Sequence, residues 1–449
     1  MAWMPKTLLT TKEEIIMAMV VKNNMSALTT LNTLNKNTNA LSKSLQKVSS
    51  GMKINSAADD ASGYAISERM RVQIRSLDQA NSNAQNGGSM MKVAEGAVSS
   101  TVEILKTLKE KAVNAANDTN TDADRATIQK EMDQSIDQIN DNANVTFNGQ
   151  YLVDGSKNKK TTETTTLMTN QSLSTVTNES TKLTALKARN GDSLNIHSTD
   201  TVTISYVKNG KTVTASTTVG KTLDLKTTIS KLTSGAVTVS GATSFIGIDG
   251  SGNTVATASG QNAITIGSTS GGIAGQIAGF TMYITDNKGN VNKSANAALD
   301  AFDESLRAQN KSEDNSIVMQ IGTKAGQSIN VGLTDMKAIA LGLQGDDGQT
   351  LSIGNQENAN AAINVLDAAI QKALDQQTTI GAIESRLEYT QSNLTTASEN
   401  VTAAESTIRD ADMAKEMTEY TKNNVLMQAA QSMLAQANQS SSNVLSLLQ

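Results

Sequence analysis

The feature that most constrains the fold of this chain is a heptad pattern within residues 400–449. Positions there alternate spacings of four and three residues, which places them along one face of a helix. That face contains Met413, Met417, Tyr420, Asn424, Met427, Gln431 and Leu434. A second, adjacent line contains Leu426, Ala430, Met433 and Ala437. A helix that is apolar along two adjacent lines needs more than one neighbour to cover it, so the sequence predicts a helix that packs against several partners.

A matching pattern begins in the N-terminal part of the chain, at Val20. Steps of three and four residues join Leu31, Leu34, Thr38, Leu41, Leu45 and Val48. Gly51 is well placed to stop this helix, and Ser56 or Asp59 is the expected cap of the next one. The second helix is predicted over residues 60–116, a rod on the order of 85 Å long at about 1.5 Å per residue. Its strictest apolar line contains Met91, Ala94, Val98, Thr101, Leu105, Leu108, Ala112 and Ala115.

A shorter returning helix is predicted next. Its apolar positions are Ile128, Met132, Ile136, Ile139 and Ala143. The Asn-Gly pair at 148–149, between two short apolar runs, is a β-hairpin signal. The composition then changes, since residues 156–295 are rich in Thr, Ser and Gly and show no heptads. Within them, 201–216 predicts two alternating strands around a tight turn and 280–285 predicts a further strand, so this stretch is expected to be a β-rich insertion.

Helical spacing returns in the last part of the chain. Residues 317–343 suggest a hairpin leading back into helix, and a long helix is predicted from about Asn358. Its apolar line contains Ile363, Leu366, Ile370, Ala373, Gln377, Ile380, Ile383, Leu387, Thr390, Leu394, Ala397, Val401, Ala404 and Ile408. Neither arm can bury its heptads alone, so the two arms are expected to pair. The predicted fold class is mainly α with a β-rich insertion: long antiparallel coiled-coil-like helices from the N- and C-terminal arms plus a variable β domain.

Composition narrows the classes of protein that fit this pattern. Only 38% of residues are hydrophobic and 2% aromatic, which is little for several ordinary globular cores and suits long thin helices. The chain has no cysteine, so disulfides and thiolate metal sites are excluded. The formal charge is −5, so the chain lacks the excess of basic residues that is typical of nucleic-acid-binding proteins. No apolar run approaches the roughly 20 residues of a membrane span.

Residues 1–18 are expected to be an over-long start or a non-native extension of the chain. A Lys-Glu-Glu run at 12–14 interrupts any signal-peptide core there. The same run could be encoded by a purine-rich stretch that resembles a bacterial ribosome-binding site. Met17 or Met19 would then be the true first residue, and mass spectrometry of the native N-terminus would identify it.

No arrangement of side chains indicates an enzyme, a metal site or a cofactor site. Asp59 and Asp60 could be paired catalytic carboxylates, but helix capping is favoured because no acid–base partner lies nearby in the sequence. His197 is the only histidine, which excludes a two-histidine zinc motif. The segment 249–253 resembles part of a calcium loop without its downstream glutamate, so a plain turn is favoured. The P-loop-like segment 219–222 lacks the first glycine of that motif.

The two arms resemble those of bacterial flagellins. In the N-terminal arm the matching motifs are SLQKVSSGMKINSAADDASGYAIS (44–67), AVNAANDT (112–119) and TFNGQYLVDG (146–155). In the C-terminal arm they are QIGTKAGQSI, IGAIESRLEYTQSNL, RDADMAKEM and LAQANQSSSNVLSLLQ. The resemblance covers roughly residues 19–156 and 313–449, and the middle of the chain shows none.

The resemblance implies how the chain divides into domains. Residues 19–52 and 410–449 would be inner-core helices, paired along the inner wall of a tube. Residues 53–156 and 313–409 would form a helical rod around them. Residues 157–312 would be a variable β-rich surface domain that projects outward.

The function that the resemblance implies is that of a structural subunit that self-polymerises into the bacterial flagellar filament for motility. The implied partners are further copies of the chain, a secretion chaperone, the flagellar type III export apparatus, the filament cap and the hook-junction proteins, and the implied location is extracellular. Polymerisation is expected to bury Leu31, Leu34, Leu41, Leu45, Met413, Met417, Met427, Leu434, Leu445 and Leu448. A hook–filament junction protein and a secreted adhesin are the alternatives.

The resemblance also implies a surface for recognition by Toll-like receptor 5. The corresponding residues are Leu105, Thr107, Lys109, Glu110, Lys111 and Val113. Thr107 stands where the family usually has an arginine, and Lys111 where it usually has a leucine. Losing a bidentate donor and an apolar anchor weakens such an interface by a few kcal/mol at most, so receptor activation is expected to be weaker than for typical flagellins.

Overall fold

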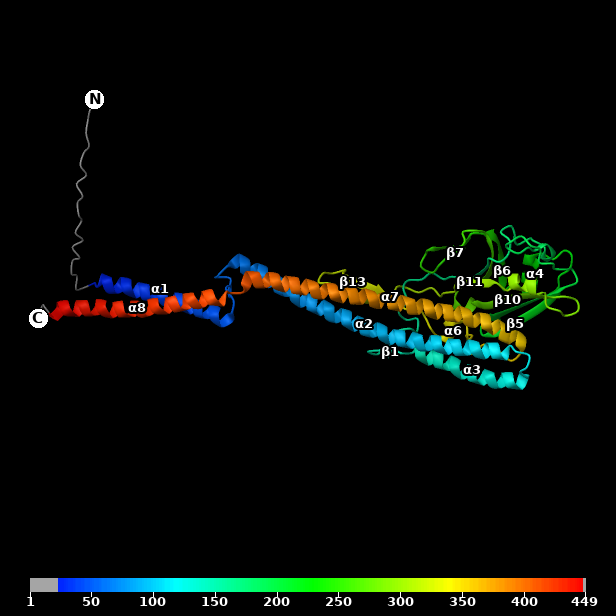
Figure 1. The fold of residues 1–449 in the computed structure, drawn as a ribbon, viewed down its shortest axis with the longest axis horizontal. Coiled ribbons are helices and arrows are strands. Elements are labelled where there is room, and N and C mark those ends of the chain that lie inside the picture. The colour runs from blue at the N-terminus through cyan, green and yellow to red at the C-terminus, as the bar shows by residue number, and fades with distance from the viewer. Residues whose placement is uncertain (1–22, 447–449) are drawn as a thin grey trace, which may run out of the picture. The chain divides into compact units, whose positions relative to one another are not determined.

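The computed structural model describes residues 23–446 (Figure 1). The expected over-long start at 1–18 and the predicted contact residue Leu448 lie outside the described residues. The described residues form two compact units, one made of residues 23–77 together with 396–446, the other of residues 78–395. No helix within 23–446 combines the length and the apolarity that crossing a bilayer requires.

The first unit is helical. It contains α1 (Met25–Ser50), the start of α2 (Ala61–Ala115), the end of α7 (Gln356–Arg409) and α8 (Met413–Ser446). Asn24 caps α1, since its side chain accepts a hydrogen bond from the backbone N of Ala27. Gly51 ends the helix with a φ of 71°, and its N–H donates to the carbonyl of Lys47. The predicted stop is confirmed, because glycine adopts this left-handed conformation without steric cost.

The cap of α2 differs from the prediction. The side chain of Asp60 accepts hydrogen bonds at 3.0 Å from two backbone N–H groups of the first turn. Asp59 instead accepts from the backbone N–H groups of residues 55–56 and from the hydroxyl of Ser56. The expectation that Ser56 or Asp59 caps α2 was wrong, because these two side chains close the preceding turn. The capping interpretation of the acidic pair holds for Asp60.

The second unit contains the rest of α2 and α7 and a returning helix, α3 (Asp122–Ala143). The 55 residues of α2 run without a break through Gly87 and Gly88, so the predicted long rod is confirmed. A capping box between Thr121 and Asp124 starts α3. The residues of the predicted strict line of α2 are all at most 1% exposed: Met91, Ala94, Val98, Thr101, Leu105, Leu108, Ala112 and Ala115.

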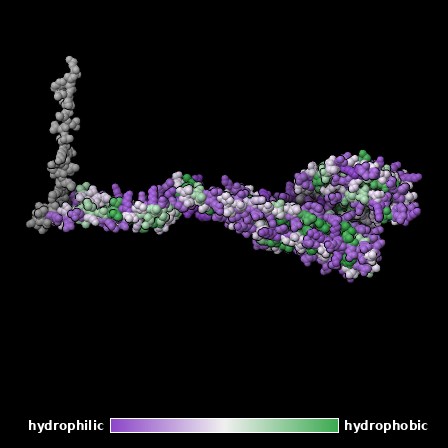
Figure 2. Space-filling view, viewed as in Figure 1, coloured by the Kyte–Doolittle hydropathy of each residue, from purple (hydrophilic) through white to green (hydrophobic). Residues whose placement is uncertain are grey.

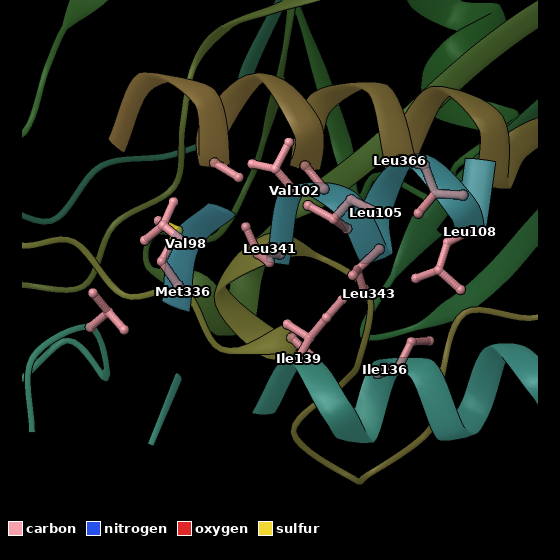
Figure 3. Packing of buried hydrophobic residues seen from close by; sticks show 14 of the residues in the cluster. Val98, Val102, Leu105, Leu108, Ile136, Ile139, Met336, Leu341, Leu343 and Leu366 are labelled. Atoms are coloured by element: carbon pink, nitrogen blue, oxygen red, sulfur yellow. The ribbon is translucent and has the colours of Figure 1, made fainter. Parts of the chain in front are cut away.

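One hydrophobic core joins these helices (Figure 3). Leu105 of α2 belongs to the same cluster as Ile136 and Ile139 of α3. Leu366 of α7 and Leu341, from the segment that leads back to α7, belong to the same cluster. Each helix covers the apolar line of its neighbours, which explains why α3 turns back along α2.

Short hairpins lie on both sides of the insertion in the sequence. They are β1 (Thr146–Phe147) with β2 (Gln150–Tyr151), and β12 (Ile317–Gln320) with β13 (Ser328–Val331). In the first, Asn148 and Gly149 have φ values of 50° and 75°, the left-handed pair that this type of two-residue turn requires. The second leads through α6 (Ala338–Leu341) toward α7. Both predicted hairpins are confirmed.

The β-rich insertion has two main sheets, with strand orders β10–β4–β5 and β11–β3–β9–β6. The strands are β3 (Leu167–Asn170), β4 (Thr201–Lys208), β5 (Lys211–Thr218), β6 (Val237–Thr243), β9 (Ala263–Ser268), β10 (Ile277–Thr285) and β11 (Phe302–Leu306). The smaller elements are the hairpin of β7 (Phe245–Ile248) and β8 (Thr254–Ala256), the helices α4 (Leu225–Leu232) and α5 (Lys293–Leu299), and 3₁₀ turns at Leu183–Ala185 and Ile273–Gly275. The strands predicted at 201–216 and 280–285 are confirmed. The helices α4 and α5 have no counterpart in the prediction, because eight and seven residues are too few to show a heptad repeat.

Charged side chains link the end of the insertion to α7. The Nη1 of Arg307 lies 3.0 Å from Oδ2 of Asp375, and its Nε lies 3.8 Å from Oε2 of Glu304. The Nζ of Lys372 donates to the carbonyl of Ala340. Burial lowers the pKa of Lys372 to about 8, against the opposing effect of the Glu304 carboxylate. Burial also raises the pKa of Glu304. Burial therefore makes the charged forms of Lys372 and Glu304 unfavourable.

The stability difference between Lys372→Met and the wild type is expected to shift by up to about 3 kcal/mol between pH 7 and pH 10, at about 1.4 kcal/mol per pKa unit. The folded pKa of about 8 lies below the ordinary 10.5, so the folded protein binds fewer protons than the unfolded chain between these values. The stability of the wild type therefore gains from this group as the pH rises through that window, whereas the variant does not. Urea unfolding at both pH values measures the shift, with Lys324→Met at an exposed position as the control. A difference that does not change with pH would show that Lys372 keeps its ordinary pKa.

Candidate assembly surface

The helices α1 and α8 lie side by side and run in opposite directions (Figure 1). Polar contacts follow the pair in antiparallel order: Asn24 Nδ2 to the Ala437 carbonyl (3.2 Å), Asn37 Nδ2 to the Leu426 carbonyl (3.2 Å), Asn423 Nδ2 to Ser44 Oγ (2.9 Å) and Lys47 Nζ to Glu416 Oε1 (3.5 Å). The predicted pairing of the two arms is confirmed. The interface is partly polar, unlike a coiled-coil seam filled by leucine and isoleucine.

Few side chains are buried between α1 and α8. Among the described residues of these two helices only Ser44 and Ala430 are buried. Four of the predicted polymerisation contacts are half-buried: Leu34, Leu41, Met427 and Leu434. Two helices side by side cannot enclose a core, so each keeps an uncovered face.

Large apolar side chains remain exposed on this pair. Each is between 41% and 62% exposed in the subunit. The exposed apolar set, as we call it, consists of Met25, Leu28, Leu31 and Leu45 on α1, and Met413, Met417, Val425, Leu426 and Met433 on α8. Figure 2 shows hydrophobic side chains at the surface along this stretch of the molecule. Apolar patches of this kind mark places where one protein binds another.

The predicted polymerisation contacts divide between two faces. Leu31 and Leu45 on α1, like Met413 and Met417 on α8, belong to the exposed apolar set, whereas the half-buried contacts face the partner helix. The side chain of Leu445 is outside the described part of the chain, as is Leu448. Sequence reasoning did not single out three members of the set: Met25, Leu28 and Val425. Extending the first line by one step of three residues back from Leu31 would have found Leu28.

A buried arginine closes the first unit where α7 ends. The backbone N of Lys53 donates to the carbonyl of Arg409 at 2.8 Å. The Nη1 of Arg409 donates to Oε1 of Glu68 at 2.6 Å, and its guanidinium lies 5.3 Å from the centre of the Tyr64 ring. The hydrogen bond from Arg409 holds the pKa of the Glu68 carboxyl below its ordinary value. One side chain thus connects the end of α7 to the start of α2.

The receptor surface predicted on α2 is only partly exposed. Leu105 is fully buried in the core of the second unit, which corrects its place in that surface. Lys109 forms an ion pair with Asp367, and Lys111 forms one with Glu131 at 2.9 Å. The remaining predicted residues are exposed: Thr107, Glu110 and Val113. Recognition by Toll-like receptor 5 stays a prediction.

Leu105→Ala is expected to destabilise the second unit by at least about 2 kcal/mol, because removing a fully buried leucine side chain leaves a cavity. Thr107→Ala, two residues along the same helix and exposed, is the matched control and is expected to change stability by about 0.5 kcal/mol or less. Urea unfolding followed by circular dichroism measures both. Equal stabilities would contradict the placement of Leu105 in the core.

The motifs considered for metal binding and catalysis have structural explanations. The Oδ1 of Asp249 accepts hydrogen bonds from the backbone N of Ser251 at 3.0 Å and of Asn253 at 2.7 Å, so the segment 249–253 is a turn, as favoured from the sequence. Asp286 makes a second turn of the same kind. Within residues 23–446 no three or more acidic or histidine side chains gather in a way that could hold a metal ion.

Comparison with known proteins decides the family. The family model of the bacterial flagellin N-terminal helical region matches residues 21–158, and that of the C-terminal helical region matches residues 363–448. A flagellin of Clostridium tyrobutyricum is 36% identical over 431 residues, which span 94% of this chain and 99% of the relative. This chain belongs to the flagellin family. A flagellin of Bacillus subtilis (strain 168) is 30% identical to it over 450 residues, with 96% and 100% of the two chains covered.

Flagellins are structural proteins, and this flagellin is a subunit of the bacterial flagellar filament. The resemblance noted in its two arms is confirmed. Among solved structures, the flagellar hook associated protein-3 of Legionella pneumophila aligns over 75% of this chain and 97% of that protein, at 16% identity and a TM-score of 0.32. A likeness of that size carries no argument about function.

Proposed function

We propose that α1 and α8 are the assembly core of this flagellin, and that neighbouring copies bury its exposed apolar set in the filament. The observation that carries the proposal is the set itself, large apolar side chains 41% to 62% exposed on a helix pair that buries little of its own surface. Fully burying one leucine or methionine side chain contributes about 1.5–3 kcal/mol. Covering this set therefore offers the first unit a large gain in stability on association.

The domain roles follow from this proposal. Residues 19–52 and 410–449 would form the inner core, 53–156 and 313–409 the rod, and 157–312 the variable surface domain. The separate core of the insertion supports the last of these assignments. Most buried residues of its two sheets form a cluster of their own, and only Val207 of β4 and Ala278 of β10 belong to the cluster of the helices. A domain with its own core can vary without changing the helical contacts on which assembly depends.

Export and location form a further part of the proposal. We infer that the chain leaves the cell through the flagellar type III apparatus with the help of a secretion chaperone. It would then assemble extracellularly beneath the filament cap, on the hook-junction proteins. Family membership supports this, and so does the small buried core between α1 and α8, because a helix pair with few buried side chains unfolds at little cost.

Recognition by Toll-like receptor 5 is proposed for the part of the predicted surface outside the core. The residues are Thr107, Lys109, Glu110, Lys111 and Val113. Ion pairs already occupy Lys109 and Lys111, which adds to the expectation of weak activation. Full potency in a cell reporter assay would contradict it.

We propose no enzymatic role for this flagellin, because the two acidic side chains considered for catalysis have structural roles: Asp60 caps α2 and Asp59 closes the preceding turn. A hook–filament junction protein and a secreted adhesin are the alternative functions. Deleting residues 157–312 separates adhesion from assembly, since the insertion has its own core. A deletion that keeps filament growth and loses host binding would assign adhesion to the insertion.

Seeded polymerisation tests the proposed assembly core. The full chain and a version that ends at Asp410 are each mixed with sheared filaments and followed by sedimentation and electron microscopy. Growth is expected for the full chain only, because the truncation removes α8 and with it five members of the exposed apolar set. Growth of both would show that assembly does not use α8. Growth of neither would favour a junction protein or a secreted binding protein.

A further inference from the structure

We propose that four exposed methionines on α1 and α8 are oxidation sites, and that their conversion to methionine sulfoxide by peroxides blocks filament growth reversibly. They are Met25, Met413, Met417 and Met433. The inference rests on the proposed assembly core, since it requires that these side chains enter contacts between copies. It adds a modification site and a way of controlling assembly.

Exposure separates these methionines from others in the chain. The four are between 43% and 62% exposed in the subunit. Met91, Met132, Met282 and Met336, by contrast, are at most 1% exposed and lie within the two hydrophobic cores. Because the rate of methionine oxidation follows access to the sulfur, the exposed group is expected to react first. The buried group provides an internal control in the same molecule.

The composition leaves these sulfurs as preferred targets for a two-electron oxidant. The chain has 18 methionines but no cysteine, so no thiol competes for the oxidant. It has four phenylalanines, six tyrosines and one tryptophan, fewer aromatic residues than methionines, so methionine supplies much of its large, adaptable apolar surface. An assembly surface built on methionine is thereby sensitive to peroxide.

The chemical step is a transfer of one oxygen atom. The thioether sulfur attacks hydrogen peroxide, the O–O bond breaks, a sulfur–oxygen bond forms, and the second oxygen leaves as water. The sulfur is oxidised by two electrons and the peroxide is reduced by two. The product carries a polar oxygen where the subunit previously had an apolar tip.

The polar oxygen is expected to weaken contacts between copies without destabilising the folded subunit. In the subunit the sulfoxide stays in water, because these side chains do not contribute to either core. In a contact between copies the same oxygen would be buried without a matching donor, which is unfavourable. We expect full oxidation of the four sites to raise the critical concentration for growth at least about tenfold, equivalent to about 1.4 kcal/mol per added subunit.

The proposed assembly also predicts that the four methionines are protected from peroxide in the filament. Once neighbouring copies cover the four methionines, peroxide should reach them more slowly than in the free subunit. Methionine sulfoxide reductases act on both epimers of the product, so treatment of the oxidised subunit with the two enzymes should restore growth.

The experiment treats the full chain with graded hydrogen peroxide, maps the sulfoxides by peptide mass spectrometry, and measures seeded growth by sedimentation. A variant with Leu at all four positions (M25L, M413L, M417L and M433L) is treated in parallel, since leucine has a similar volume and does not react. Circular dichroism of each sample checks that the helices are retained. The expected result is oxidation of the four sites before the buried methionines, loss of growth in the wild type, growth of the treated variant, and recovery of the wild type after reductase treatment.

Two outcomes would overturn the inference while leaving the assembly core intact. One is undiminished growth of a subunit that is fully oxidised at the four sites. The other is oxidation of the buried methionines at the same rate as the exposed ones. Failure of the untreated chain to grow on seeds would overturn the proposed function and this inference with it, so the two failures are distinguishable.

Discussion

Leu45→Glu is expected to abolish filament growth while leaving the folded subunit unchanged. Leu45 is 52% exposed in the subunit, so a glutamate there meets water and little of the core is lost. In the proposed filament a neighbouring copy covers this position, and burying an unpaired carboxylate is costly. We expect the critical concentration to rise at least about 100-fold, equivalent to about 2.7 kcal/mol per added subunit.

Gln46→Glu is the matched control, because it places the same charge on the next residue, at an exposed polar position. Its effect on growth should stay within about 0.5 kcal/mol. Met417→Glu and Thr418→Glu repeat the comparison on α8. Sedimentation measures seeded growth of each substitution and its control, and circular dichroism checks that each subunit stays folded. Normal growth of Leu45→Glu would remove that residue from the contact, and equal loss in both members of a pair would trace the effect to charge alone.

The buried face of α2 could be predicted residue by residue, whereas that of α1 could not. A helix packed inside one chain buries its most apolar line, as the second half of α2 does. On α1 the polar residues Asn37 and Ser44 bond to α8, while Leu31 and Leu45 remain exposed. On our proposal both faces of α1 are covered in the filament, one by α8 and the other by another copy. Hydrophobicity alone does not show which face of α1 packs against α8 and which packs against another copy.

Local and long-range chemistry set further limits on prediction from the sequence. The choice of Asp60 over Asp59 as the cap of α2 depends on backbone geometry within a single turn. The cluster of Glu304 and Lys372 depends on contact between the insertion and α7, segments far apart in the chain. Neither leaves a periodic signal. The two arms were predictable because long helices repeat their pattern many times.

Arg409→Met is expected to open the junction between α7 and α8. The side chain of Arg409 is 6% exposed and bonds to Glu68 at 2.6 Å. Removing the guanidinium takes away this hydrogen bond and the packing against the Tyr64 ring, so we expect the junction to open more readily and its amides to exchange faster. Because amide hydrogen exchange reports local opening, it is a better measure of this junction than a whole-chain melting temperature. The amide of Lys53, which donates to the carbonyl of Arg409, reports directly on the junction.

Arg71→Met is the matched control for this substitution. Arg71 also lies near Glu68, at 3.7 Å, and pairs with Glu405 at 3.2 Å, but its side chain is 40% exposed. Exposed ion pairs contribute about 1 kcal/mol or less, so protection of the Lys53 amide should change little. Equal loss of protection in Arg71→Met and Arg409→Met would mean that total charge around Glu68, rather than the buried contact, closes the junction.

Lowering the pH should abolish the difference in protection of the Lys53 amide between the wild type and Arg409→Met. The hydrogen bond from Arg409 lowers the pKa of Glu68 from 4.5, so at moderately low pH the folded protein binds fewer protons than the unfolded chain. The contribution of the pair is therefore present at neutral pH and is lost as the pH falls below 4.5 and through the lowered pKa. Protection of the Lys53 amide in the wild type and in the variant should converge in that range. If the difference persists in acid, the packing of Arg409 against the Tyr64 ring, rather than its bond to Glu68, is what holds the junction closed.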